Sequence, residues 1–181
     1  MYCFQNPNCC GFRCLVGPRG PQGVPGPQGP QGPIGPAGPT SHVYGMIYND
    51  GNQSVVINTA NTYVTVGLNT MGPASNTTVS TNEITIDESG TYAVYYRLHF
   101  AAGASQILTA AVFNSGSAIT ATTTAATTVE VGSENYEATL GAETIVELNE
   151  GDVLSLGLTS NTTGTVTVGG LGNATLSVKK L

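Results

Sequence analysis

Four cysteines carry the most reactive side chains of the sequence, and all of them lie in segment 1–16: Cys3, Cys9, Cys10 and Cys14. Their spacing, C-x5-C-C-x3-C, is a poor match to the two C-x-x-C pairs that usually surround a zinc ion. Adjacent Cys9 and Cys10 do not readily bond to each other, but they suit bridges to two different partners. The pattern therefore favours interchain or intermolecular disulfides, with metal binding and free thiols as the alternatives.

The remainder of segment 1–16 fits either an anchor or a disordered terminus. Tyr2, Phe4 and Phe12 could dock against a partner, because aromatic side chains are common anchors of interfaces. Chain termini are, on the other hand, often poorly ordered. The segment has no charged n-region and no apolar h-region, so it does not predict a secretory signal. We interpret residues 1–16 as a cysteine-containing anchor or connector.

Acid–base and metal chemistry have few candidates in the sequence. The histidines, His42 and His99, could each act in catalysis, but a histidine at a surface or subunit interface is the commoner case. No G-x-S-x-G, H-E-x-x-H or P-loop pattern is present. Several acidic residues could hold calcium, although strand alternation and turn preference explain them more simply: Glu130, Glu134, Glu137, Glu143, Glu147, Glu150 and Asp152. We therefore expect no enzyme activity, no cofactor and no bound metal.

Strict periodicity distinguishes residues 17–40, where every third position is glycine: Gly17, Gly20, Gly23, Gly26, Gly29, Gly32, Gly35 and Gly38. Seven of these eight glycines precede a proline, and after the exception, at Val24, Pro25 takes the third place of the triplet. Only a hydrogen fits on the axis of a collagen triple helix, so glycine is obligatory there. A single-chain linker would have no reason to keep the period. The segment predicts a collagen-like stalk of roughly 70 Å, and therefore a homotrimer.

Composition separates a head, residues 41–181, from this stalk. These 141 residues contain one proline, Pro73, no tryptophan, and many Val, Ile, Thr, Gly and Asn residues, which is typical of strands and turns. The formal net charge of −6, with only five Lys and Arg residues, excludes the basic face that a nucleic-acid reader needs. No apolar run is long enough to predict a membrane span.

About ten short strands are expected in the head, without any helical period. The clearest is Thr91–Ala101, in which apolar and other residues alternate. The other expected strands are Val43–Tyr48, Ser54–Asn58, Thr62–Leu68, Glu83–Asp87, Ile107–Phe113, Ala118–Thr128, Thr144–Leu148, Val153–Leu158, Thr165–Val168 and Ala174–Lys179. Asp50-Gly51 is a hairpin turn signal, and Asn69–Asn76, with Gly72-Pro73, is expected as a loop. This pattern predicts an all-β, antiparallel jelly-roll sandwich.

Two local sequences resemble a known class of trimeric heads. Gly90–Val94, with the sequence GTYAV, and Leu148–Leu156, with LNEGDVLSL, are similar to the heads of the complement and tumour-necrosis-factor superfamily. Val43–Asn49 and the ending Asn173–Leu181 resemble collagen-like glycoproteins of the bacterial spore exosporium (BclA-like). Segment 1–16 departs from the usual leader of those glycoproteins, and its cysteines look more like the connectors of disulfide-linked spore appendages.

The resemblance implies a structural role and a subunit interface. Tyr92, Val94, Tyr96, Leu98 and Phe100 would fill the sandwich, while Tyr95, Arg97 and His99 would face the other subunits. The chain would be a homotrimer on the spore surface, in the exosporium or on a spore appendage. It would be bound to a coat, exosporium or appendage protein through residues 1–16. The alternative function is a trimeric adhesin or lectin-like module whose head binds a glycan or a host surface.

Overall fold

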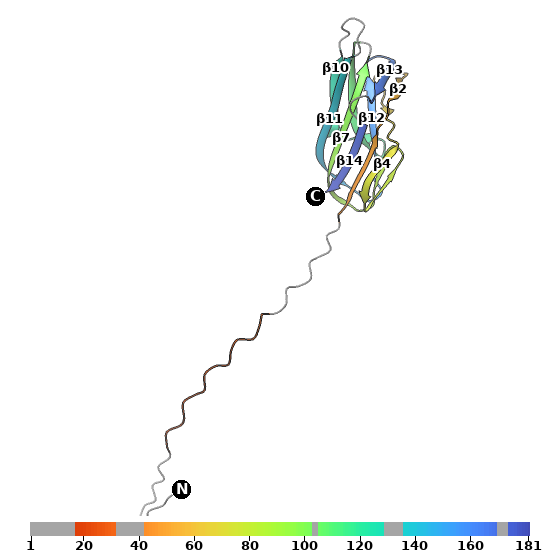
Figure 1. Cartoon of the computed structure of the whole chain (residues 1–181). Helices are drawn as coiled ribbons and strands as arrows, with labels where there is room; N and C mark the ends of the chain where they lie inside the picture. The colour runs from red at the N-terminus through yellow and green to blue at the C-terminus, as the bar shows by residue number, and fades with distance from the viewer. Residues whose placement is uncertain (1–16, 32–41, 103–104, 129–135, 170–173) are drawn as a thin grey trace, which may run out of the picture. The chain divides into compact units, whose positions relative to one another are not determined.

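The computed structural model describes residues 17–31, 42–102, 105–128, 136–169 and 174–181. The chain divides into two compact units, Met1–Gly38 and Pro39–Leu181. The four cysteines, together with Gly32, Gly35 and Gly38, lie outside the described residues. Figure 1 shows the described part of each unit in colour.

Within the first unit, residues 17–31 are exposed and form neither helix nor strand. A Cβ atom added at any of five glycines would meet no atom within 4 Å: Gly17, Gly20, Gly23, Gly26 and Gly29. Within a single chain, therefore, no steric contact requires glycine at these positions. The triple helix stays a prediction, since the crowding that it invokes needs three chains.

The second unit is an antiparallel β-sandwich, with one short 3-10 turn as the helical element among its described residues. Its first strands are β1 (Tyr44–Asn49), β2 (Gln53–Ile57), β3 (Val64–Thr65), β4 (Thr70–Ser75), β5 (Thr77–Ser80) and β6 (Glu83–Ile86). The middle of the chain forms β7 (Gly90–Ala102), β8 (Gln106–Asn114), β9 (Ser117–Ala118), the 3-10 turn η1 (Thr120–Thr122) and β10 (Thr124–Thr128). The last strands are β11 (Tyr136–Leu148), β12 (Val153–Ser160), β13 (Gly164–Val168) and β14 (Ala174–Lys180).

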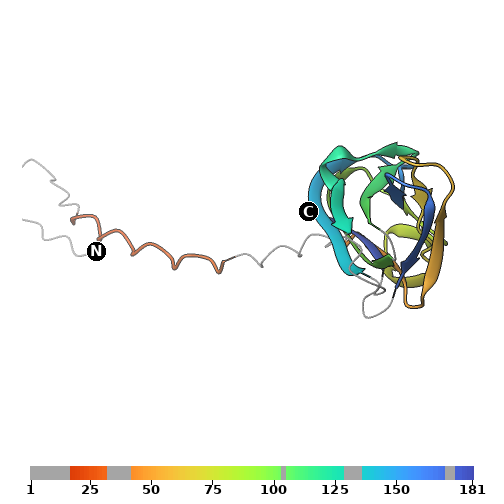
Figure 2. The same ribbon diagram turned by 90° about the horizontal axis from the view of Figure 1, so that it is seen from above.

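Two sheets, which we call sheet A and sheet B, face each other across one core. In sheet A the paired strands follow the order β2-β13-β7-β14-β1-β4. β13 and β14 pair with successive parts of one edge of β7, and β11 pairs with its other edge. Sheet B has the order β10-β8-β12-β6-β5, and the short strands β3 and β9 pair with β12 and β8. Figure 2 shows the strands from above, arranged around the shared interior. The expected all-β antiparallel sandwich is therefore confirmed.

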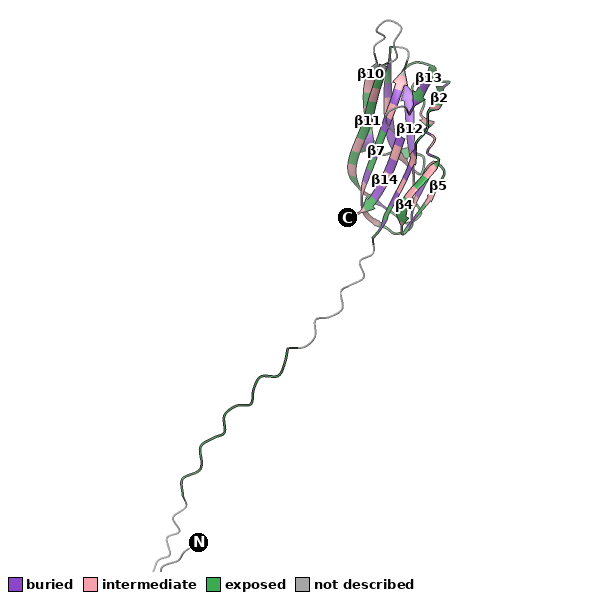
Figure 3. Cartoon of the chain, in the orientation of Figure 1, coloured by how far each residue is buried: buried purple, intermediate pink, exposed green. Residues whose placement is uncertain are grey.

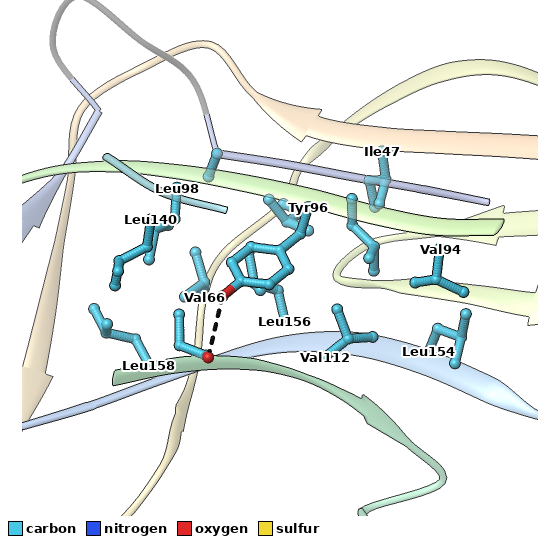
Figure 4. Close-up of a cluster of buried hydrophobic side chains, with 14 of the residues drawn as sticks. Ile47, Val66, Val94, Tyr96, Leu98, Val112, Leu140, Leu154, Leu156 and Leu158 are labelled. Atoms are coloured by element: carbon cyan, nitrogen blue, oxygen red, sulfur yellow. Dashed lines mark hydrogen bonds between the residues drawn. The ribbon is translucent and has the colours of Figure 1, made fainter. Parts of the chain in front are cut away.

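Alternation along β7 builds the centre of this core. The five side chains expected to point inward, Tyr92, Val94, Tyr96, Leu98 and Phe100, are all fully buried. The Tyr96 hydroxyl donates to the carbonyl oxygen of Ala110 at 3.1 Å (Figure 4). The same hydroxyl also contacts the hydroxyl of Thr124. Burial raises the pKa of Tyr96, with the Thr124 hydrogen bond opposing the shift. A buried phenol is stable here because its hydroxyl is satisfied across the sandwich.

Local backbone conformation and hydrogen bonds shape the turn between β11 and β12 and so set the direction of β12. Gly151 has a φ of +89°, a left-handed conformation that glycine adopts without strain. The Asn149 amide donates to Oδ2 of Asp152 at 2.8 Å, and the Asp152 amide donates back to the Asn149 carbonyl at 3.0 Å. This reciprocal pair closes the turn and directs β12 into sheet B.

Two expectations about the first part of the head were wrong. The Asp50-Gly51 sequence does not make a hairpin, because both edges of β1 are already occupied, by β14 and by β4. Instead, the Gly51 amide donates to Oδ1 of Asn49 at 3.1 Å, and β2 pairs with β13. The segment expected as a loop contains β4, an edge strand in which Pro73 needs no second neighbour.

Other strand limits also differ from the expectation. Only Val64–Thr65 of the expected strand 62–68 is a strand, and β5 was not expected at all. The polar run 118–128 is interrupted by η1, where the Thr122 hydroxyl is buried and binds the Ile119 carbonyl at 2.7 Å. β11 begins at Tyr136 rather than Thr144 and pairs with β7 along its whole length.

Candidate functional site

The face of sheet A that points away from the core is the candidate site. Four neighbouring strands, β1, β14, β7 and β11, present alternate side chains there. Figure 3 shows buried and less buried residues alternating along β7, β11 and β14. The side chains of this exposed face are Tyr44, Met46 and Tyr48 on β1; Thr175, Ser177 and Lys179 on β14; Ala93, Tyr95, Arg97 and His99 on β7; and Glu137, Thr139, Glu143, Ile145 and Glu147 on β11.

Strand register arranges these residues in rows across the face. The first row is Tyr44, Lys179, Ala93 and Ile145; the second is Met46, Ser177, Tyr95 and Glu143; the third is Tyr48, Thr175, Arg97 and Gly141. Partners in register project to the same side of a sheet and lie about 5 Å apart. Residues far apart in the sequence thus share one surface.

Apolar and aromatic groups are concentrated in the first two rows. Ile145 is 66% exposed, and Tyr44 and Tyr95 are each 39% exposed. A shallow depression of about 310 Å³ lies between the two tyrosines, over β1, β14 and β7. Its lining is Tyr44, Gly45, Met46, Pro73, Ala93, Tyr95, Glu143, Ser177, Val178 and Lys179. An open, partly aromatic depression beside an exposed isoleucine fits a protein–protein contact.

Charge on the exposed face is divided between its strands. β11 presents Glu137, Glu143 and Glu147, and no base on its described residues. β7 and β14 present Arg97 and Lys179, and no acid. The face is therefore acidic along the β11 edge and basic toward its middle.

Three of these charges have no side-chain partner within the described part of the chain: Arg97, Lys179 and Glu143. The other two glutamates differ, because Glu147 accepts a hydrogen bond from the Thr91 hydroxyl at 2.6 Å and Glu137 lies near His99. Opposite Arg97 on β11 stands Gly141, which has no side chain that could pair with the guanidinium. These unpaired charges are available to a partner.

His99 lies on the same face but is largely covered. Its Nδ1 contacts the Thr139 hydroxyl at 3.1 Å, and its Nε2 lies 3.9 Å from Oε2 of Glu137. The Nε2 atom is buried and makes no hydrogen bond in the described structure. His42, the other histidine, is exposed, and its carbonyl accepts a hydrogen bond from the Asn76 side chain at 3.3 Å.

The structure thus places Tyr95, Arg97 and His99 together on the face of β7 that points away from the core, the face that the resemblance implied for them. It adds Tyr44, Ile145 and Lys179, which the sequence did not single out, and Glu143, which the sequence offered only as a possible calcium ligand; only the strand register brings these residues together. Whether these residues contact other subunits stays a prediction. Neither Glu130 nor Glu134 can be placed, since both lie outside the described residues.

The described residues contain neither a metal-binding cluster nor a membrane-spanning helix. No group of three His, Cys, Asp or Glu side chains is arranged there to hold a metal ion. Likewise, no helix in that part of the chain is long and apolar enough to cross a membrane.

Comparison with known proteins gives the class of fold. No family model and no curated protein matches the sequence. Among solved structures, 242 chains match, and one of them is the structure of Eiger TNF from S. frugiperda. It is 12% identical, with a TM-score of 0.57, over 78% of this chain and 93% of that chain. The head therefore has a fold like that of tumour necrosis factor, and at this identity the likeness shows the fold alone.

Proposed function

We propose that this chain is a trimeric structural protein, with a collagen-like stalk, a jelly-roll head and an N-terminal anchor. The observation that carries the proposal is the unbroken glycine period next to a TNF-like fold. A strict Gly-X-Y repeat has a physical reason only where three chains meet at an axis. A trimeric head would hold three such chains together at one end.

The head is expected to supply the stability that the stalk lacks. Eight triplets make a short triple helix, which would nucleate poorly without a trimerising domain. The exposed face of sheet A supports this role, because Tyr44, Tyr95 and Ile145 expose apolar surface that a monomer would leave in water. Tyr95, Arg97 and His99 form part of the proposed trimer interface.

We place the protein on the surface of a bacterial spore, in the exosporium or on a spore appendage. The support is the resemblance of Val43–Asn49 and Asn173–Leu181 to exosporium glycoproteins, together with the cysteines of segment 1–16. Those cysteines would link the trimer to a coat, exosporium or appendage protein. No catalytic activity is proposed for the TNF-like head.

The test has a biochemical and a cellular part. Sedimentation of the full chain at micromolar concentration should give a single trimer, and antibodies to the head should label spores or their appendages in electron micrographs. A monomer in sedimentation would refute the trimer. Trimers that leave spores unlabelled but bind cells or a glycan array would favour the adhesin or lectin-like alternative.

A further inference from the structure

The division of charge on the exposed face of sheet A suggests how one copy recognises the next, given the proposed trimer on which this inference rests. A closed trimer uses a heterologous contact, in which two different patches of each copy meet. The exposed face offers two such patches: the acidic β11 edge with protruding Ile145, and the tyrosine-lined depression flanked by Arg97 and Lys179.

Rotational symmetry fixes which residues lie at the same level. We take the threefold axis of the proposed trimer to run along the strands. Rotation about such an axis leaves the height of every residue unchanged, so Ile145 of one copy would meet the first row of the next. That row contains Tyr44, Lys179 and Ala93, all of which line the depression. An exposed isoleucine would then lie over a depression at its own height.

The same geometry positions the charges. Glu143 of one copy meets the second row of the next, which contains Tyr95 and Ser177. Lys179 belongs to the row on one side of this level and Arg97 to the row on the other, and neither has a side-chain partner among the described residues. Rows two residues apart along a strand are about 7 Å apart, which long basic side chains can span.

We propose that Glu143 of each copy binds between Arg97 and Lys179 of the next copy, with Ile145 seated in the adjoining depression. The contact is directional, and the charges act as the recognition element of the trimer. Complementary charges suppress wrong partners as well as favouring the right one. Chains that carry this charge arrangement would select copies of themselves.

A charge-reversal exchange with full-length chains tests the proposal. The variant Glu143→Lys presents a lysine to Arg97 and Lys179, and the double variant Arg97→Glu/Lys179→Glu presents two glutamates to Glu143. Each variant alone should form trimers about tenfold more weakly than the wild type. Combined, the two variants should form mixed trimers, because two of the three contacts in a mixed trimer bring opposite charges together, whereas a trimer of either variant alone has none.

Native mass spectrometry of differently tagged chains provides the readout. The two variants, refolded together, should give a larger share of mixed trimers than two tagged wild-type chains give. Glu83→Lys is the matched control, because Glu83 is exposed on β6 of sheet B and the charge change is identical; it should assemble like the wild type. If the wild type is a trimer but the charge-reversal variants assemble as well as it does, this inference fails while the proposed trimer stands. The same holds if the two variants show no preference for mixed trimers. A monomeric wild type would instead overturn the proposed trimer.

Discussion

Tyr95 and Tyr96 are neighbours in the sequence but lie on opposite faces of β7. Tyr96 is fully buried and hydrogen-bonded across the sandwich, whereas Tyr95 is 39% exposed beside the depression. Tyr96→Asp should unfold the head, because it removes a large core side chain and buries a charge, at a cost above about 4 kcal/mol. Tyr95→Asp should dissociate the trimer and leave the β-sheet signal in circular dichroism largely intact.

Far-UV circular dichroism and sedimentation separate these two outcomes. Tyr95→Phe serves as a conservative control and should keep the trimer, because the ring supplies most of the buried area. If Tyr95→Asp and Tyr96→Asp behaved in the same way, the assignment of the two faces would be refuted.

Alternation in the sequence separated the residues of β7 into two faces, and the resemblance to TNF-like heads implied which face points inward. Alternation could not predict the neighbours of Tyr95, because Ser177 and Glu143 come from strands that are distant in the chain. Which strands are adjacent, and in which register, depends on long-range packing rather than on local pattern. Ile145 was assigned to a strand, but its exposure on an unpaired edge was not visible in the sequence.

Among the elements, the strands with the clearest apolar alternation were those predicted well. β7 and β12 combine inward apolar residues with marked turns at their ends. β4 was missed because Gly72 and Pro73 are typical of loops, although an edge strand tolerates proline on its unpaired side. The first half of β11, with Glu137 and Gly141, has low strand propensity and is held by its pairing with β7.

The predicted triple helix of the stalk can be tested by a single substitution that leaves the head unchanged. In one chain, a Cβ atom at Gly29 would meet nothing within 4 Å, so Gly29→Ala is harmless unless three chains meet there. In a triple helix the same methyl group has no room on the axis and should disrupt the helix locally. We expect residues 17–40 of the variant to become sensitive to protease, while the head trimer survives.

Gln28→Ala is the matched control for this substitution. It adds no atom at the axis, because Gln28 is in the third position of its triplet. The control should therefore resist protease as the wild type does. Equal resistance of Gly29→Ala and the wild type would show that the stalk is not a triple helix.

Over the whole molecule, the cysteines and the folded head occupy different parts of the chain, which suggests that they serve different functions. The head has no cysteine, so its fold does not depend on disulfides, and its core is built from apolar strands. All four cysteines precede the stalk. Thiols that do not stabilise the head are free to serve attachment, which is the role proposed for segment 1–16.

The last prediction follows from this separation. Deletion of residues 1–16 should leave a folded trimer, because neither the glycine period nor any described strand of the head includes them. The deleted form should no longer decorate spores in immunogold electron microscopy. Replacement of Cys3, Cys9, Cys10 and Cys14 by serine should give an intermediate result, with attachment that heat and detergent reverse. Covalent attachment through intermolecular disulfides requires that reductant release the wild type under the same conditions. Undiminished labelling of the deletion form, insensitive to reductant, would place the anchor elsewhere in the chain.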